Sequence, residues 1–363
     1  MNSLPLHEFH HTLGARFGEV NGAEVVADYG EPVTEYTALH QTAGVLDLSF
    51  RSRICLTGAD RARFLHGQVT NDVNRLSPGA GCYAAITTAK GKMEGDLNIY
   101  ALADELLLDF EPGLTEKITA RLEKFLVADD VQIVDVAALY GLLSVQGPKA
   151  GEVIAALGIF PALPAKPLQS VKISDAMLGE IYLVAIVRTA FSGFDLFVPT
   201  DSLAAVADKL IAAAKSIGGR ACGWGALENS RIEAGIPRYG ADMDESNIPL
   251  ECGIESSAIS YQKGCYIGQE VINRIHSIGH VNKELRSLRL ASELSALPIK
   301  GDKLFHGDKD AGYLTSAAKS PITDSISALG YVRREANAPG TELTLRSAGG
   351  ETKVAISASP LPK

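Results

Sequence analysis

Hydrophobic and polar residues alternate along much of the chain with a period of two, the spacing expected of β-strands with one buried face. Two longer stretches, 114–126 and 202–216, place their apolar residues three and four positions apart, which predicts amphipathic helices. Strands joined by hairpins, with helices between them but no regular strand–helix–strand alternation, predict an α+β fold. The strand-like runs cover 52–57, 82–87, 95–102, 105–110, 131–134 and 138–145.

The chain divides into regions of different character. After a connector rich in proline and alanine at 160–167, the stretch 173–216 repeats the order of strands followed by a helix, which suggests an internal structural repeat. From Arg286 onward, short β-prone runs are separated by glycine and proline turns, and no long helix is predicted. We therefore predict two α+β lobes in residues 1–284 and a β-barrel domain in residues 285–363.

Composition and charge narrow the range of partners. The 363-residue chain carries a formal net charge of -9, which disfavours nucleic acid as the main ligand because phosphate binding needs a basic surface. No window approaches 18 uncharged apolar residues, so we expect no transmembrane helix and no membrane partner. The first residues, Met-Asn-Ser-Leu, lack the basic and apolar regions of a signal peptide, and we expect a cytoplasmic protein.

The cysteines indicate reduced thiols rather than a disulfide framework or a metal centre. Their number is odd, and no two of them form a CxxC pair of the kind that holds zinc. We therefore predict no metal site built by this chain alone. The five are Cys55, Cys82, Cys222, Cys252 and Cys265.

The segment 263–274 combines a cysteine with cationic side chains and an amide–carboxylate pair. A free cysteine is commonly buried and inert. We expect Cys265 instead to be reactive or to face a ligand, because Lys263 is close in sequence and a helix beginning near Ile267 would place the thiol at its positive end. The polar members of the segment are Lys263, Cys265, Gln269, Glu270 and Arg274.

Asp96 and Arg231 are candidate ligand-binding residues whose sequence context leaves two interpretations open. Asp96 begins an apolar strand, where a carboxylate either caps the strand end or faces a cavity and accepts hydrogen bonds from ring or amine N–H groups. Arg231 lies on a predicted helix that stops at Gly235, and it either grips a ligand carboxylate or is a solvated helix-end side chain.

Several segments together resemble the T-protein (aminomethyltransferase) superfamily of folate-dependent proteins, almost end to end. Segment 263–270, Lys-Gly-Cys-Tyr-Ile-Gly-Gln-Glu, resembles the signature of its YgfZ-type branch, whose members bind tetrahydrofolate and support the assembly or repair of iron–sulfur enzymes. The resemblance implies a three-lobed ring around a central folate site, with a β-barrel as the last lobe. The shorter matching segments are 44–49, 70–73, 144–148, 231–235, 239–240 and 312–316.

The same resemblance implies tetrahydrofolate as the cofactor and assigns residues to it. Asp96 is similar to the aspartate that contacts folate near its reactive nitrogens, with a one-residue ambiguity, because the aminomethyltransferases have two aspartates where this chain has Gly95-Asp96. Tyr83 matches their tyrosine beside the pterin, and Arg231 matches an arginine of theirs. We predict that folate binds Tyr83, Asp96, Arg231, Lys263, Gln269, Glu270 and Arg274, and that Cys265 and Asp96 are catalytic.

Three functions are compatible with this resemblance. The first is a tetrahydrofolate-binding protein that supports iron–sulfur enzymes, with assembly or client proteins as partners and Cys265 as the reactive thiol. The alternative is a folate-dependent aminomethyltransferase that transfers a one-carbon unit to tetrahydrofolate. The loop at 188–192 weighs against the alternative, because it lacks the pterin-binding glutamate that aminomethyltransferases carry there. A third is a folate-binding module without chemistry.

Overall fold

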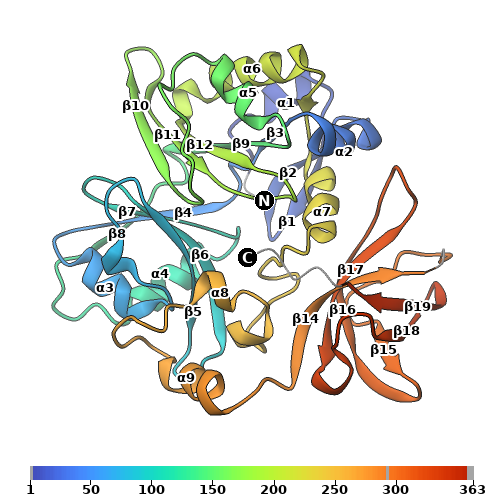
Figure 1. The fold of residues 1–363 in the computed structure, drawn as a ribbon. Helices are drawn as coiled ribbons and strands as arrows, with labels where there is room; N and C mark the ends of the chain where they lie inside the picture. The colour runs from blue at the N-terminus through green and yellow to red at the C-terminus, as the bar shows by residue number, and fades with distance from the viewer. Residues whose placement is uncertain (1–2, 292–293, 358–363) are drawn as a thin grey trace. The chain divides into compact units, whose positions relative to one another are not determined.

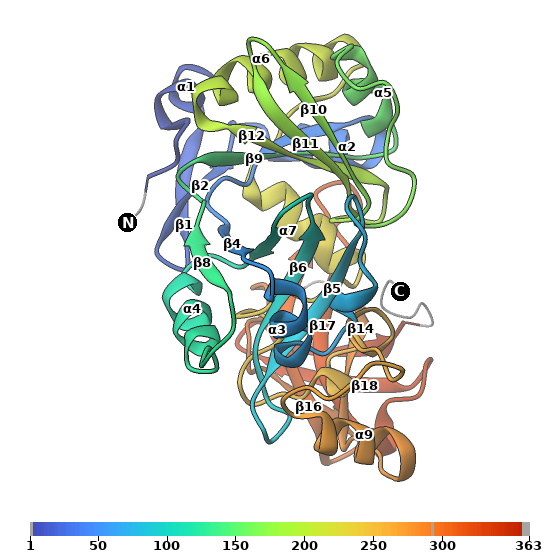
Figure 2. The ribbon, with the colours of Figure 1, turned by 90° about the vertical axis from the view of Figure 1, so that its left-hand side faces the viewer.

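The structure is a computed structural model that describes residues 3–291 and 294–357 (Figures 1 and 2). The chain forms two compact units, each assembled from separate parts of the sequence. None of the helices in the described residues is both long and apolar enough to span a bilayer. Unit 1 comprises Met1–Gln68, Asp72–Ala84 and Asp96–Leu227, and unit 2 comprises Val69–Asn71, Ala85–Gly95 and Glu228–Lys363.

The first sheet has five strands in the order β5-β6-β7-β4-β8. Its central strands are almost wholly buried, which fits their content of leucine, isoleucine and other apolar residues. Two helices belong to the same lobe, α3 (Arg61–Gln68) and α4 (Thr115–Glu123). The strands are β4 (Ser52–Thr57), β5 (Gly81–Thr87), β6 (Met93–Ala101), β7 (Leu106–Phe110) and β8 (Gln132–Asp135).

The second sheet of unit 1 has six strands in the order β10-β11-β12-β9-β3-β13. Helices α5 (Ala150–Ala156) and α6 (Thr200–Ser216) pack on one face of it (Figure 2), and their apolar residues enclose a core with those of the strands. The strands are β3 (Gly44–Asp47), β9 (Tyr140–Gln146), β10 (Ser170–Asp175), β11 (Gly179–Ala185), β12 (Gly193–Pro199) and β13 (Arg220–Ala221).

The C-terminal part of unit 2 is a closed six-stranded barrel in the order β14-β17-β16-β15-β18-β19. Two neighbouring strands of the barrel lie so close together at Gly312 that a Cβ at this position would lie 1.9 Å from the Tyr331 carbonyl oxygen. The predicted α+β fold with a C-terminal β-barrel is thus confirmed, while the predicted boundary between 284 and 285 stays a prediction. The strands are β14 (Lys283–Leu290), β15 (Lys303–His306), β16 (Lys309–Lys319), β17 (Ile326–Arg333), β18 (Glu342–Ser347) and β19 (Gly350–Ile356).

The N-terminal helix α1 (His7–Thr12) is fixed to unit 1 by a buried chain of polar side chains. Nε2 of His10 lies 2.8 Å from Oδ2 of Asp47 at the end of β3, and Nδ1 of His10 lies 2.9 Å from the Tyr29 hydroxyl. His10 and Asp47 are both buried. A buried carboxylate needs such partners, because an unpaired one is strongly destabilising. The pair therefore holds the first helix against the second sheet.

Replacing His10 by alanine is expected to lower the free energy of unfolding by about 3 kcal/mol, because Asp47 and Tyr29 both lose a buried partner. His7→Ala is the matched control, since His7 lies on the same helix, contacts Glu24 at 2.9 Å and is partly exposed. Its loss is expected to be about 1 kcal/mol or less. Urea unfolding followed by circular dichroism measures both variants, and equal losses would contradict the structural role given to His10.

Candidate functional site

Tyr83 and Asp96, both predicted to bind folate, lie together in unit 1. Tyr83 is on β5 and Asp96 on the neighbouring strand β6, and the Tyr83 hydroxyl donates to Oδ2 of Asp96 at 2.7 Å. Gly95 and Leu97 are buried, so the alternation of the strand places Asp96 on its other face, with Asn98. Burial raises the pKa of Asp96 to about 6, although the hydrogen bond from Tyr83 acts in the opposite direction.

A row of charged side chains continues from Asp96 across the first sheet. The register of β6 with β7 pairs Asn98 with Asp109, and Asp96 precedes Asn98 by two residues on the same face of β6. The register of β4 with β7 pairs Ser52 with Phe110, so Arg51 and Glu111 each lie one residue beyond this pair. Arg51 Nε donates to Oδ1 of Asp109 at 2.8 Å, and Arg51 Nη1 donates to Glu111. These three strands thus bring one guanidinium and three carboxyl groups together.

Arg188 joins the same network from the loop between β11 and β12. Its Nη2 donates to Oδ2 of Asp195 at 2.6 Å and lies 3.5 Å from Oδ2 of Asp109. Asp109 also accepts from Asn98 Nδ2 at 3.2 Å. Burial opposes the ionisation of Asp109, but Arg51 and Arg188 outweigh it and hold the pKa of Asp109 below its ordinary value. The network therefore keeps an ionised carboxylate in the interior of unit 1.

The predicted site residues include Asp96 but not Arg51, Asp109, Glu111 or Arg188. One signal was present: polar residues at alternate positions on two neighbouring strands, Asp96 and Asn98 on β6, and Asp109 followed by Glu111 on β7. A spacing of two puts each pair on one face of its strand. The register that pairs Asn98 with Asp109, and the arginine that binds Asp109 and Glu111 from far upstream in the sequence, become visible only in the folded chain.

Lys263 has a structural role in unit 2. Its side chain is buried, and Nζ donates to the carbonyl oxygens of Val69 at 2.6 Å and Asn71 at 2.9 Å. The ammonium also lies 4.8 Å from the centre of the Tyr266 ring, within the range of a cation–π contact. Lys263 therefore bridges two distant parts of the chain, and its expected action on the Cys265 thiol stays a prediction.

The rest of the segment alternates between exposed residues, such as Cys265 and Arg274, and buried ones, such as Tyr266 and Ile272. The helix expected near Ile267 begins two residues later, as α9 (Gln269–Ile278), because Gly268 adopts a left-handed conformation with φ 91°. A Cβ at Gly268 would lie 2.5 Å from Thr87 Oγ1, so the position favours glycine. Cys265 lies four residues before the helix and is exposed. In the described residues, no group of three or more His, Cys, Asp or Glu is arranged to hold a metal ion.

The other predicted members of the segment lie on the first turns of α9. Gln269 is partly buried, and Glu270 and Arg274 are exposed. The structure therefore places Gln269, Glu270 and Arg274 on one short helix of unit 2, within a few residues of Cys265. Their contact with folate stays a prediction.

Arg231, on α7 (Trp224–Glu233), lies in a separate cluster of unit 2. Its Nη1 donates to Asp242 at 2.5 Å and to the Ile236 carbonyl, and Nε and Nη2 each donate to Glu228 at 3.0 Å. Nη2 also donates to Ser316 Oγ on β16 at 3.2 Å. Burial opposes its charge, but Asp242 and Glu228 raise the pKa of Arg231 above its ordinary value. The guanidinium is committed to protein partners, and its contact with folate stays a prediction.

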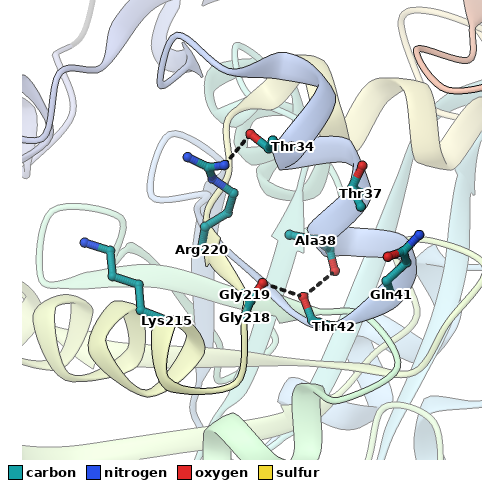
Figure 3. A pocket seen from close by; sticks show the side chains of 9 residues that line it. All are labelled: Thr34, Thr37, Ala38, Gln41, Thr42, Lys215, Gly218, Gly219 and Arg220. Atoms are coloured by element: carbon teal, nitrogen blue, oxygen red, sulfur yellow. Dashed lines mark hydrogen bonds between the residues drawn. The ribbon is translucent and has the colours of Figure 1, made fainter.

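A surface cavity of about 350 Å³ in unit 1 contains none of the predicted site residues (Figure 3). It lies between α2 (Pro32–Gln41) and the turn that follows α6. Arg220 donates to Thr34 and pairs with Glu31 at 2.7 Å, while Thr42 donates to backbone carbonyls of α2 and Gly218. Because these groups largely bind one another, we assign the cavity no ligand.

Comparison with known families identifies the class of protein that this fold defines. The family model "GCVT N-terminal domain" matches residues 6–263, and "Glycine cleavage T-protein C-terminal barrel domain" matches residues 283–363. Together they cover both lobes of unit 1 and the barrel. The chain belongs to the glycine cleavage T-protein family.

Individual relatives agree with this assignment. The chain is 26% identical over 362 residues to an aminomethyltransferase of Shouchella clausii, covering 99% of this chain and 97% of the relative. It is 32% identical over 270 residues to an aminomethyltransferase of Cupriavidus necator, covering 70% of each. The crystal structure of the glycine cleavage system aminomethyltransferase T from Bartonella henselae superposes with a TM-score of 0.88 at 23% identity, covering 99% of this chain and 98% of that one. At that identity the superposition shows a shared fold.

Replacing Lys263 by methionine is expected to lower the free energy of unfolding by about 2–4 kcal/mol, because the carbonyls of Val69 and Asn71 lose a buried charged donor. Arg274→Met is the control, since Arg274 is an exposed cation of the same segment and its replacement is expected to change stability by about 0.5 kcal/mol or less. Thermal unfolding measures both. A Lys263→Met protein of wild-type stability that has lost folate binding would show that Lys263 contacts the ligand instead.

Proposed function

We propose that the protein binds tetrahydrofolate and that the carboxyl group of Asp96 contacts it. The observation that carries this proposal is the Tyr83–Asp96 pair, because Asp96 accepts a hydrogen bond from a neutral hydroxyl, whereas Asp109 and Glu111 are paired with Arg51. A carboxyl group without a guanidinium partner retains acceptor capacity for a ligand. Membership of the T-protein family supports folate as that ligand.

The chemistry of Asp96 suits a ligand that carries both N–H groups and amine nitrogens. Its ionised form accepts hydrogen bonds from N–H donors, and its protonated form donates to a nitrogen lone pair. With the pKa of Asp96 raised to about 6 by burial, both forms are accessible close to neutral pH. General acid–base groups work best when their pKa lies near the operating pH. Reduced folates present such nitrogens beside the pterin ring.

The first candidate use of the bound folate is transfer of a one-carbon unit, as in an aminomethyltransferase. Several similar proteins are aminomethyltransferases, and two of them align over 99% of this chain. This support is stronger than that for the iron–sulfur function. In such a reaction Asp96 would exchange a proton with a folate nitrogen, and Tyr83 would stabilise the resulting carboxylate.

The second candidate is support of iron–sulfur enzymes, and exposure of Cys265 favours it. The thiol stands at the surface of unit 2 on a segment fixed by Lys263 and Gly268, so it is accessible to a partner protein or a metal. Iron–sulfur clusters are usually held by four ligands, so one thiol requires ligands from a partner. In this role Cys265 would act as a transient ligand or as a redox group, and it would not hold a cluster permanently.

Tetrahydrofolate is expected to bind the wild-type protein, and Asp96→Asn is expected to weaken binding by roughly 10- to 100-fold, because a charge-assisted hydrogen bond is worth about 1.5–3 kcal/mol. Tyr83→Phe should weaken it less, since the carboxyl group remains. Glu116→Gln, an exposed position on α4, is the control and should bind like wild type. Isothermal titration calorimetry provides the affinities, and unchanged affinity in Asp96→Asn would remove the proposed contact.

The two uses of folate predict different outcomes for Cys265→Ala. If the protein supports iron–sulfur enzymes, a strain that depends on it should lose most of the activity of such enzymes with Cys265→Ala and keep it with Cys82→Ala. If it is a transferase, purified Cys265→Ala should form methylenetetrahydrofolate from an aminomethyl donor as fast as wild type. Full iron–sulfur enzyme activity in the Cys265→Ala strain would count decisively against the second candidate.

A further inference from the structure

A second cavity of unit 1, of about 120 Å³, is lined by residues of both sheets of that unit. An apolar cavity of about 150 Å³ can hold one molecule of benzene, so this one is large enough for a compact ligand of a few carbon atoms. None of the residues predicted to bind folate lines it. Much of its wall is apolar, and the apolar lining residues are Leu102, Leu107, Val136 and Phe197.

Arg53, on β4, is the cationic residue of the lining, and its side chain is fully buried. Its Nη2 donates to the carbonyl oxygens of Ser49 at 3.0 Å, Ala137 at 3.1 Å and Tyr140 at 2.9 Å. Its Nε and Nη1 have no hydrogen-bond partner among the described residues. Burial lowers the pKa of Arg53 to about 10, so the guanidinium remains charged at neutral pH. A buried charge with unused donors is strongly destabilising, and an anionic group in the cavity supplies an acceptor for them.

Carboxylates and aromatic rings line the less buried part of the cavity. Glu180 is exposed, so the cavity opens to solvent there, and Glu105 is partly buried. The rings of Tyr140 and Tyr182 lie 6.3 Å apart at an interplanar angle of 62°. Glu180 and Glu105 add to the effect of burial in raising the pKa of Tyr140, because both negative charges lie near that ring. These surroundings attract an ammonium group, which can pair with a carboxylate and lie against the ring faces.

Arg53 and Glu105 line the cavity beside the same strand, β4. Arg53 and Cys55 are two residues apart on that strand, so their side chains project from the same face. Burial and the neighbouring Glu105 raise the pKa of the Cys55 thiol, which keeps the thiol neutral. Glu180 pairs with Lys172 at 2.7 Å, whereas Glu105 has no ion pair within the part of the chain that the structure describes. The cavity therefore presents a positive and a negative group that do not pair with each other.

We propose that this cavity binds a small apolar amino acid, with its carboxylate toward Arg53, its ammonium group toward Glu105 and its side chain against the apolar wall. The carboxylate accepts from the unused N–H groups of Arg53, and the ammonium group donates to Glu105. Phosphate and dicarboxylates are repelled by Glu105 and Glu180, and a monocarboxylate without an amine leaves Glu105 unpaired. The site shares no residue with the proposed folate contact, so the inference does not rest on the proposed function.

The test is isothermal titration calorimetry of the full-length protein with three probes that share one carbon skeleton: L-valine, isovalerate and isobutylamine. L-valine is expected to bind. Isovalerate, which lacks the ammonium group, should bind at least about tenfold more weakly, and isobutylamine should bind more weakly still, because it leaves Arg53 without an anion. Absence of L-valine binding overturns the inference, and so does isovalerate that binds as tightly as L-valine.

Variants of the lining residues locate the site. Glu105→Gln is expected to weaken L-valine binding by roughly 10- to 100-fold and isovalerate binding not at all, because only the amino acid carries an ammonium group. Asp104→Asn, at the exposed neighbouring position, is the matched control and should bind L-valine like wild type. Arg53→Met should abolish binding of both acids, and if it does not fold, Glu105→Gln decides. Equal losses of L-valine affinity in Glu105→Gln and Asp104→Asn overturn the contact, whereas tetrahydrofolate affinity should be unchanged in Glu105→Gln.

Discussion

The buried ion pair of Arg51 with Asp109 and Glu111 is the interaction on which the interior of unit 1 depends. Arg51, directly before β4, binds carboxylates of β7 and of the residue beyond it, so one charge links these two strands. Arg188 then reaches Asp109 from the second sheet at 3.5 Å. Removal of either arginine would take a charged partner from buried carboxylates, which is far more destabilising than loss of a surface pair. The same network holds the strand on which Asp96 sits.

The segment 263–270 contains both residues that are held in place by the fold and an exposed thiol, and its sequence does not show which residues belong to which group. Lys263 and Gly268 are fixed by the fold, one through backbone carbonyls and the other through a left-handed turn in close contact with Thr87. Cys265, between them, is exposed. A rigid frame around an accessible thiol limits the directions from which another molecule can approach it. Lys263 and Gly268 therefore fix the backbone on either side of Cys265, whose reactivity stays a prediction.

Sequence patterns were most informative where the local environment decides the structure. The alternation at 52–57 predicts β4 with its observed bounds, Ser52–Thr57, and the turn-rich tail predicts the barrel. The pattern predicts a helix start near Ile267, and its position at Gln269 depends on Gly268, which packs closely against Thr87. The role of Lys263 was missed for the same reason, since its partners lie 194 and 192 residues away. Long-range contacts of this kind leave no periodic signal.

The discontinuity of unit 2 has a consequence during synthesis. Val69–Asn71 and Ala85–Gly95 leave the ribosome long before Glu228–Lys363, with which they form one compact unit. At a synthesis rate of about 5–20 residues per second, roughly 10–40 seconds pass between the synthesis of Val69 and Asn71 and that of Lys263, which binds their carbonyls. During that interval the β5–β6 hairpin carries a tip whose native neighbours do not yet exist. Nascent chains that stall before residue 263 would therefore expose this tip to chaperones or to aggregation.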